Sequence, residues 1–570
     1  MHFNSLLVGI ISFLGFIIAY HTYGRFLSKK IFRLDEKFQT PSHSLKDGYD
    51  YVPTRKEIVF GHHFTSIAGL GPIVGPAIGI IWGWVPAILW VVFGSIFLGA
   101  VHDFGALVVS LRARGKTLGE VAGKLVSPRV KYLFLLIIFF ELWIVIAIFA
   151  LIIGILFQMY PASVFPIWME IPIAMWLGHM VYRKRGNPLG ISIIALLLMY
   201  GTILVGAYLL PIKMPSIGVL SGIEVWMLIL FLYCYIASTL PVWKLLQPRD
   251  FINSHELIVL FFLLFLGLLF SRPLIVAPSV QLHPPGAPGI WPFLFVIIAC
   301  GAISGFHSLV SSGTSSKQLE SETHAQFVGY GGMIMEGALA VLVLTAVMGG
   351  IGLGIKTKGG ILTGSSAWHH FYYSWHAASG LNAKISAFVN GSVNMLSSLH
   401  IPENLASTLL GVFLVSFAAT TLDSATRIQR YVISELAQGS RLNFLSYRHP
   451  ATLVAVLSAL ALAFAQKGGK GAMILWPLFG TVNQLLAGLA LLVITVYLVK
   501  RKINAIYTFI PFLFMTVMTG WALLLNIRNF YHTHIWHLFS IGLGVFFLET
   551  WMIGESILAI RKGIRKNIKF

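Results

Sequence analysis

The stretch HHFTSIAGLGPIVGPAIG, residues 62–79, decides how this chain folds. It begins with two histidines and then places six helix-weakening residues within eleven positions: Gly69, Gly71, Pro72, Gly75, Pro76 and Gly79. Proline removes a backbone donor, and glycine leaves the backbone loose. At membrane depth such irregular backbone is tolerated only where protein or a water-filled cavity covers it. The stretch therefore predicts a substrate or ion site in a polytopic transporter, with close helix packing by small residues as the alternative.

The composition places the whole chain in a membrane. Of the 570 residues, 57% are hydrophobic and 11% are charged, and the mean hydropathy is +0.82. Soluble globular proteins do not have this make-up. Repeated apolar runs of about twenty residues fit helices, because outer-membrane strands would give short alternating segments. Cys234 and Cys300 lie inside such runs, so we expect free buried thiols.

Fifteen apolar segments are expected to form transmembrane helices. They cover roughly residues 5–24, 63–82, 84–111, 132–158, 162–182, 188–210, 222–242, 256–276, 291–313, 325–353, 404–426, 450–466, 472–499, 505–526 and 533–560. The first of them lacks a basic start and a cleavage site, which predicts an uncleaved anchor.

The basic residues predict the orientation of the chain. Of the 40 Lys and Arg, 32 lie in the odd-numbered connections and the C-terminal tail. By the positive-inside rule these parts are cytoplasmic, so the N-terminus is outside and the C-terminus inside. The net charge of +20 therefore indicates topology and contact with anionic membrane lipid, not a nucleic-acid partner.

A second interruption is predicted at Pro241, in the segment 222–242. It follows the first by five segments and so enters the membrane from the opposite side. Interrupted segments at equivalent places in two inverted halves indicate the binding site of a secondary transporter. We therefore divide the chain into a peripheral helix (1–26), a cytoplasmic connection (27–62), a core (63–432) with repeats 63–210 and 222–432, and peripheral C-terminal helices with a basic tail (449–570).

The substrate site is expected beside the two interruptions, in a cavity near the middle of the membrane. Amides at the ends of half-helices favour anions, so they would hold a substrate carboxylate. The residues assigned to substrate binding are Ser66, Gly69, Gly71, Gly75, Ser238, Thr239 and His307.

Ion coupling is assigned to isolated acids and to a run of hydroxyls. Acids inside membrane segments are costly and point to function. A protonated, hydrogen-bonded Glu141 and an Asp103 paired with Arg112 or Arg114 are the structural alternatives. Hydroxyls suit Na⁺, whereas Lys317 favours proton coupling or an anionic substrate, unless it only reaches to headgroups. The assigned residues are Asp103, Glu141, Ser311, Ser312, Thr314, Ser315 and Lys317.

A gate near the cytoplasmic mouth is assigned to His62, His63, Asp423 and Arg427. Asp423 and Arg427 have the i, i+4 spacing of a helix ion pair, which is compatible with a gate or with a plain structural pair. Two polar amides, Asn483 and Gln484, lie in an apolar segment and are expected to join helices.

Several long runs resemble the carbon starvation protein A (CstA) family of bacterial inner-membrane transporters. They are DGYDYVPTRKEIVFGHHFTSIAGLGPIVGPAIG, IWGWVPAILWVVFGSIFLGAVHDFGALVVSLRARG, CGAISGFHSLVSSGTSSKQLESE, FAATTLDSATRIQRYV and WPLFGTVNQLLAGL. The resemblance implies import of peptides or pyruvate under starvation, driven by the proton gradient. It also implies distant similarity to transporters with a five-plus-five inverted-repeat (LeuT/APC-like) core, in agreement with the segment count.

The sequence therefore predicts an all-α polytopic membrane protein that works as a proton-coupled symporter by alternating access. Its partners would be a small carboxylate-bearing substrate, a coupling proton or sodium ion, and lipid; no catalytic residue or cofactor is expected. One alternative is a nutrient sensor that carries no flux. Another is a metal or haem protein using His62, His63, His102 and His307, although no zinc or haem spacing is present.

Overall fold

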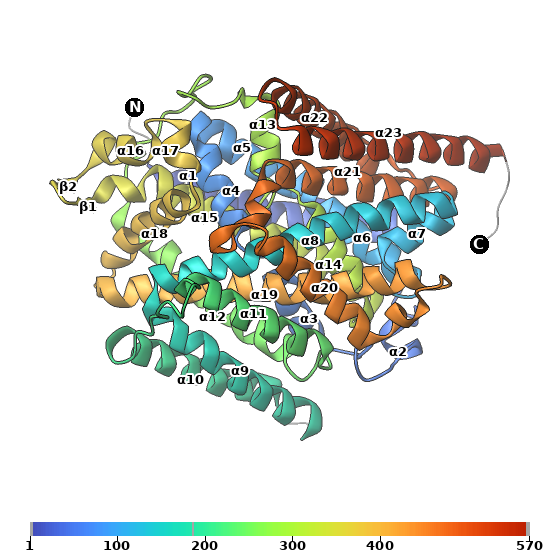
Figure 1. Ribbon diagram of the computed structural model, residues 1–570, viewed down its shortest axis with the longest axis horizontal. Helices are drawn as coiled ribbons and strands as arrows, with labels where there is room; N and C mark the ends of the chain where they lie inside the picture. Colours follow the sequence, from blue (N-terminus) through green and yellow to red (C-terminus); the bar gives the residue numbers. More distant parts are fainter. Residues whose placement is uncertain (1–3, 185–186, 566–570) are drawn as a thin grey trace.

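The computed structural model describes residues 4–184 and 187–565 and is built almost wholly from helices (Figure 1). The ends of the predicted N-terminal helix and basic tail, residues 1–3 and 566–570, lie outside this range. Within it the strands are a single short hairpin, β1 (Ile355–Thr357) paired with β2 (Gly360–Leu362).

The described residues up to Ser271 form twelve α-helices. They are α1 (Ser5–Ala19), α2 (Pro41–Ser44), α3 (Lys56–Ala68), α4 (Gly71–Gly79), α5 (Trp84–Gly94), α6 (Ala100–Arg112), α7 (Leu118–Leu125), α8 (Pro128–Met159), α9 (Val164–Gly178), α10 (Pro188–Tyr208), α11 (Gly222–Thr239) and α12 (Leu246–Ser271).

The described residues from Ile290 to Arg565 form eleven more. They are α13 (Ile290–Ile297), α14 (Gly305–Gly313), α15 (Gly331–Met348), α16 (Gly364–Tyr372), α17 (Trp375–Ser379), α18 (Leu381–Ser397), α19 (Glu403–Ala437), α20 (Arg448–Ala463), α21 (Trp476–Lys500), α22 (Ile506–His532) and α23 (Trp536–Arg565).

Twelve described helices, some extended by π or 3₁₀ turns, are long and apolar enough to cross a membrane, and the bent pair α3–α4 makes thirteen. The all-α polytopic architecture is thus confirmed. The remaining two of the fifteen expected segments are not long continuous helices. Residues 291–313 are split into α13 and α14, and residues 450–466 correspond to the shorter helix α20.

The first predicted interruption is confirmed. Helices α3 and α4 meet at a bend of 40°. Gly69 lies there with φ +47°, and an added Cβ would lie 2.5 Å from the Thr421 hydroxyl, so the bend requires glycine. The connection before it is shorter than residues 27–62, because a π-helical extension of α1 reaches Phe32 and α3 begins at Lys56.

The second interruption lies elsewhere than predicted. Helix α11 ends at Thr239, and Leu240 is extended (φ −72°, ψ 151°), as expected for a residue before proline. Pro241 therefore ends a complete helix and interrupts none. The second break is the unwound segment 298–304 between α13 and α14, where Gly301 has φ +87°.

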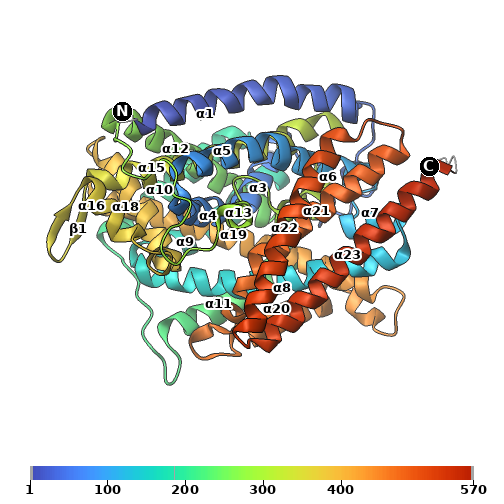
Figure 2. The same cartoon turned by 90° about the horizontal axis from the view of Figure 1, so that it is seen from above.

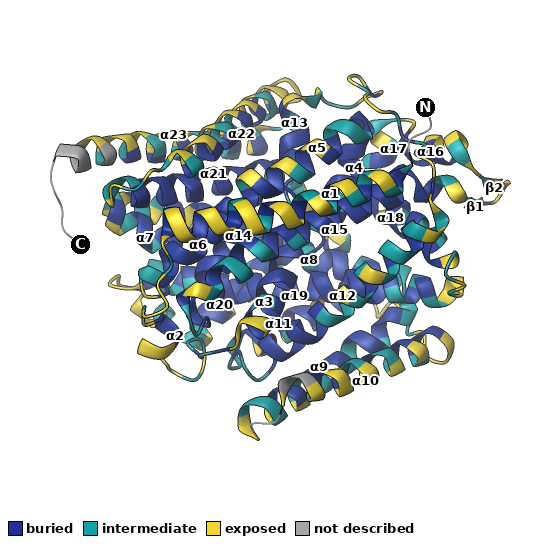
Figure 3. Ribbon diagram, turned by 180° about the vertical axis from the view of Figure 1, so that it is seen from behind, coloured by how far each residue is buried: buried dark blue, intermediate teal, exposed yellow. Residues whose placement is uncertain are grey.

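Burial separates a core from a periphery (Figure 3). The most apolar windows of α15 and α21 are 89% and 94% buried, against 28% for those of α1, α10 and α23. In Figure 1, α9 and α10 form the lower edge and α22 and α23 the upper edge, and Figure 2 shows α1 along one side. The expectation that the last four segments are all peripheral is therefore wrong for α21, which packs against α6 and α14.

Candidate functional site

The two interruptions pack against each other. A Cβ added to Gly71 would lie 2.3 Å from Cys300, and one added to Gly75 would lie 2.8 Å from the Ile297 carbonyl oxygen. Helix α4 thus contacts the end of α13 and the unwound segment so closely that only glycine fits. In this conformation Gly71 and Gly75 serve the close packing that was the alternative to a substrate site.

Helix α21 fixes the second interruption. The Asn483 Oδ1 atom accepts hydrogen bonds from the Ser304 hydroxyl (3.1 Å) and from the Phe306 N–H (3.0 Å). Gln484 donates to the Phe295 carbonyl at 2.9 Å. The two amides therefore join helices, as expected.

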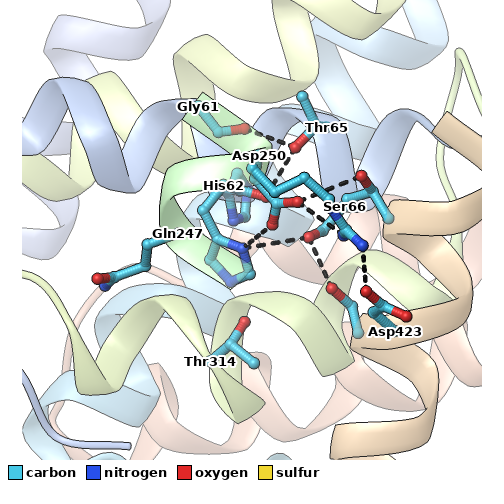
Figure 4. A network of polar contacts seen from close by, with 12 residues as sticks. Gly61, His62, Thr65, Ser66, Gln247, Asp250, Thr314 and Asp423 are labelled. Carbon is cyan, nitrogen blue, oxygen red and sulfur yellow. Dashed lines mark hydrogen bonds and ion pairs between the residues drawn. The ribbon is translucent and has the colours of Figure 1, made fainter. Parts of the chain in front are cut away.

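A buried charged network lies beside the first interruption (Figure 4). His62 Nδ1 is 2.6 Å from Asp250 Oδ2. The Arg249 guanidinium donates to Asp250 Oδ1 at 2.9 Å and also pairs with Asp423. All four side chains are at most 2% exposed, so they depend on one another for charge compensation.

Three further side chains complete this network. The Tyr233 hydroxyl donates to Asp423 at 2.8 Å, and the Thr420 hydroxyl donates to Asp250 at 3.2 Å. Glu170 of α9 lies 3.9 Å from Arg249 Nε. One guanidinium and one imidazole therefore face three carboxyl groups.

Two hydroxyls connect the network to the bend. Ser66 Oγ is 2.8 Å from Ser424 Oγ and 3.4 Å from His62 Nδ1. Ser66 and His62, assigned to substrate binding and gating, are thus brought together with Asp423.

Sequence reasoning missed Arg249 and Asp250 because hydropathy placed them in a loop. Helix α12 begins at Leu246, ten residues before the expected apolar start at 256. A signal was present: Pro248 is tolerated in a first helical turn, and the residues after it contain no further breaker before the apolar run.

The predicted ion pair between Asp423 and Arg427 does not form. Asp423 faces Arg249, whereas Arg427 Nη1 donates to Asp50 at 2.9 Å. Both positions are buried on α19, so each side chain meets a partner from a neighbouring segment instead of its neighbour along the helix.

Arg427 also caps α11, donating to the Ala237 and Leu240 carbonyls. The predicted substrate residues Ser238 and Thr239 lie at this helix end. Thr239 bonds to the Tyr235 and Ile236 carbonyls of its own helix, and the buried Ser238 hydroxyl has no partner among the described residues.

A charged cluster surrounds Asp50, in the segment before α3. Arg430 donates to Asp50 at 3.1 Å. Burial raises the pKa of Asp50, but Arg430 and Arg427 outweigh it, and the pKa lies well below its usual value. The Lys317 ammonium lies 3.5 Å from the Tyr431 ring centre; burial lowers the pKa of Lys317 to about 8, and Asp50 offsets only part of this.

A cavity of about 370 Å³ opens beside this cluster. Its charged lining is Arg114, Lys116, Glu120, Lys124, Lys317 and Glu435. Four cations and two acids give it a positive balance.

Asp103 belongs to a second buried cluster. It accepts from His102 Nδ1 at 2.7 Å and from His307 Nδ1 at 3.0 Å. It is therefore not the partner of Arg112, which pairs with Glu322 at 2.6 Å. His307 Nε2 faces Glu336, at 3.3 Å.

One group among the described residues has the composition and spacing to hold a metal ion. The ligand atoms of Cys300, His307 and Glu336 lie within 4.8 Å of one another. The four histidines considered as metal or haem ligands do not form one site, because His62 contacts Asp250 and His63 contacts Ser315.

The other residues assigned to ion coupling are dispersed. Ser312 and Thr314 bond to carbonyls of α14, and Ser315 lies 2.9 Å from His63 Nδ1. Neither the Ser311 hydroxyl nor the Glu141 carboxyl has a partner among the described residues. Glu141 is fully buried on α8.

The family model described as "Carbon starvation protein CstA" matches residues 4–362 and 370–522. The chain belongs to this family. Among its CstA relatives, "Peptide transporter CstA" of Campylobacter jejuni is 33% identical over 88% of this chain and 78% of its own length. "Pyruvate/proton symporter BtsT" of Escherichia coli is 30% identical over 92% of this chain and 81% of its own length.

Solved structures with a similar course of the chain are more distant from this CstA-family member. A manganese transporter of Eremococcus coleocola is 13% identical, with a TM-score of 0.44 over 91% of this chain and 99% of its own. MhsT, solved with L-phenylalanine, is 12% identical, with a TM-score of 0.44 over 89% of this chain and 98% of its own.

Proposed function

We propose that this chain is a secondary active transporter of the bacterial inner membrane that imports peptides or pyruvate as a carbon source. The names of its CstA-family relatives support the substrate classes. The observation that carries the proposal is the network at the α3–α4 bend, where buried carboxyl groups outnumber cations. Such a site is short of positive charge, and a transported cation supplies it.

The charge count supports coupling to a cation. Asp250, Asp423 and Glu170 face Arg249 and His62, so even with His62 protonated one positive charge is missing. Burying an uncompensated carboxylate costs several kcal/mol, so the network binds a proton or a sodium ion in this conformation. A cation bound in only one conformation shifts the balance between outward-open and inward-open states.

Arg249 is the proposed partner of the substrate carboxylate. Its planar guanidinium forms bidentate pairs with carboxylates, and pyruvate and a peptide C-terminus both present one. In this conformation Asp250 and Asp423 hold it. A proton that binds to either acid weakens its ion pair with Arg249. Arg249 can then release that aspartate and bind the substrate carboxylate instead. Ser66, whose hydroxyl lies 3.4 Å from His62 Nδ1, is the adjacent polar side chain on the bend.

Glu141 is a second proposed proton carrier. An unpaired carboxylate at this depth is unfavourable, so the isolated Glu141 carries its proton here. Helix α8 packs along α19, which holds Asp423, so the two acids lie on neighbouring helices. Proton transfer between them would require rearrangement of the side chains or water.

The pairing of the two interruptions leads us to propose different repeat boundaries from 63–210 and 222–432. The first repeat would begin at α3 and end at α12, and the second would begin at α13 and end at α21. Six spans separate α3–α4 from α13–α14, so the two broken elements cross in opposite directions, as an inverted repeat requires. The α9–α10 hairpin would be an insertion.

The cluster of Asp50 with Arg427 and Arg430 is the proposed cytoplasmic gate. It joins the segment before α3 to α19 through ion pairs whose side chains are at most 15% exposed. Breaking them frees the N-terminal half of the broken helix to move. The positive balance of the adjacent cavity favours departure of an anionic substrate on this side, in line with an external N-terminus and a cytoplasmic C-terminus.

Reconstitution in liposomes tests the function. Labelled pyruvate and a labelled dipeptide are offered separately under an imposed proton gradient, an imposed sodium gradient, or neither. We expect accumulation of one substrate under the proton gradient, abolished by a protonophore. Binding without uptake under any gradient would instead identify a sensor.

A further inference from the structure

The group around the second interruption has features that transport of a carboxylate does not use. Glu336 of α15 and His307 of α14 are fully buried, and Cys300 belongs to the unwound segment 298–304. One ligand atom of each residue lies within 4.8 Å of the other two, and His307 Nε2 is 3.3 Å from Glu336 Oε2. Oxygen, nitrogen and sulfur atoms converging from three chain segments form a ligand set.

The contact between His307 and Glu336 is not a hydrogen-bonded ion pair. Charge-assisted N–H···O bonds measure about 2.7–2.9 Å. The separation here is 3.3 Å, and both Nε2 and Oε2 lack a hydrogen-bond partner among the described residues. Two ligands at about 2.0–2.1 Å from a tetrahedral ion lie roughly 3.3 Å apart, so the spacing fits an ion held between them.

The surrounding groups orient the ligands. His307 Nδ1 is 3.0 Å from Asp103, which makes Nδ1 the protonated nitrogen and leaves the Nε2 lone pair facing the group. A carboxylate commonly accepts a hydrogen bond from a metal-bound imidazole in this way and fixes the orientation of its ring. The Gly301 N–H donates to Glu336 Oε1 at 2.9 Å and leaves Oε2 free.

We propose that Cys300, His307 and Glu336 bind a divalent transition metal ion of the zinc class. A thiolate, an imidazole and a carboxylate are ligands for a borderline-soft ion, and hard ions such as Ca²⁺ prefer oxygen alone. Three protein ligands leave the fourth tetrahedral position to water or a carbonyl. Cys300 is only partly buried, so the ion enters past the thiol.

The ion would tie the second interruption to the core. Its ligands connect the unwound segment with α14 and α15, and through Asp103 with α6. Movement of α14 relative to α15 would separate the ligands. Metal binding would therefore favour the present conformation.

The site could not be predicted from sequence spacing. The ligands are 7 and 29 residues apart, unlike the paired spacings of zinc motifs. The three ligands come together only when the unwound segment packs against α15.

Cobalt binding tests the proposal, because a thiolate bound to Co²⁺ gives a charge-transfer absorption that histidine and carboxylate ligands do not. Full-length protein lacking a histidine tag is purified in detergent, treated with a chelator and titrated with Co²⁺. We expect one equivalent with this absorption and displacement by one equivalent of Zn²⁺. Wild-type protein without the absorption, or without saturable binding, would overturn the site.

Matched variants locate the ligands. Cys300→Ser should lose the charge-transfer absorption, whereas Cys234→Ser, at the other free cysteine, should keep it. Asp103→Asn should keep the absorption but weaken affinity for the metal about 10- to 100-fold, because Asp103 orients His307 without itself binding the ion. Each variant is compared with the wild type by size exclusion and circular dichroism. Absorption that persists in a folded Cys300→Ser would contradict the assignment.

Discussion

Arg249 determines the charge balance of the buried network, and its shape matters as much as its charge. Lysine keeps the charge but not the planar fork. We expect Arg249→Lys to fold and to lose uptake by at least about tenfold, the effect of losing roughly 1.4 kcal/mol of binding. Arg249→Gln leaves the acids unpaired and should lower stability by about 3–5 kcal/mol.

Uptake assays and thermal melts in detergent measure these effects. Arg441→Gln, at an exposed loop position, is the control and should match the wild type. Unchanged uptake by Arg249→Lys would remove the guanidinium from substrate binding.

Glu141 is predicted to carry a proton, and glutamine imitates the protonated form. Glu141→Gln should therefore leave expression and stability nearly unchanged, within about 1 kcal/mol, but abolish uptake driven by a pH gradient. The exposed Glu403→Gln serves as the control. Unchanged accumulation would exclude Glu141 from the mechanism.

Lys317 predicts a pH-dependent stability. Its pKa in the folded protein, about 8, is below that of an unfolded lysine, so the buried charge is costly below pH 8. This cost disappears as the pH rises from 8 past the unfolded pKa. Lys317→Met should therefore stabilise the protein at pH 7 by on the order of 2 kcal/mol, and by much less near pH 10.

Thermal melts at the two pH values measure this difference. The exposed Lys358→Met should show no such dependence. If Lys317→Met stabilised the protein equally at both pH values, burial would not lower the pKa of Lys317.

The sequence indicates which ionisable residues in apolar runs are candidates for function, but it does not indicate which residues they contact. The sequence singled out Asp103, Glu141, His307 and Asp423 because an ionisable group is conspicuous among apolar side chains. Pairings such as Asp423 with Arg249 join positions 174 residues apart, and they depend on how the helices pack.

At the scale of elements, the contact between the two interruptions depends on glycine. A methyl group at Gly75 would lie 2.8 Å from a backbone carbonyl, which cannot move like a side chain. Gly75→Ala should therefore cost about 1–3 kcal/mol. At Gly201 on α10 an added Cβ meets nothing within 4 Å, and alanine should stabilise by roughly 0.5–1 kcal/mol.

Thermal melts of these two variants compare a crowded glycine with an open one. Equal shifts in both would show that α4 and the segment 298–304 are not held in close contact.

The first interruption was predictable and the second was not. Six Gly and Pro residues within eleven positions leave no continuous helix, whereas 298–304 carries a single glycine, Gly301, inside a long apolar run. Pro241 was misinterpreted because a proline gives the same signal at the end of a helix as within one.

At the scale of the whole molecule, composition and the resemblance to the CstA family gave the helical membrane architecture and the family. The number of spanning helices differs from the fifteen expected, because hydropathy counts apolar stretches and not continuous helices. Burial of α21 could not be predicted either, since a core helix and a lipid-facing helix are both apolar. Its Asn483 and Gln484 indicated contact with other helices, and the structure confirms it.

The most direct test of cation coupling at the first bend compares wild type with Asp423→Asn in liposomes. Asparagine keeps the shape and removes one carboxyl group, so the network is no longer short of positive charge. We predict that wild type accumulates its substrate under a proton gradient, whereas Asp423→Asn exchanges labelled for unlabelled substrate without accumulating it. Accumulation by Asp423→Asn equal to that of the wild type would contradict the account.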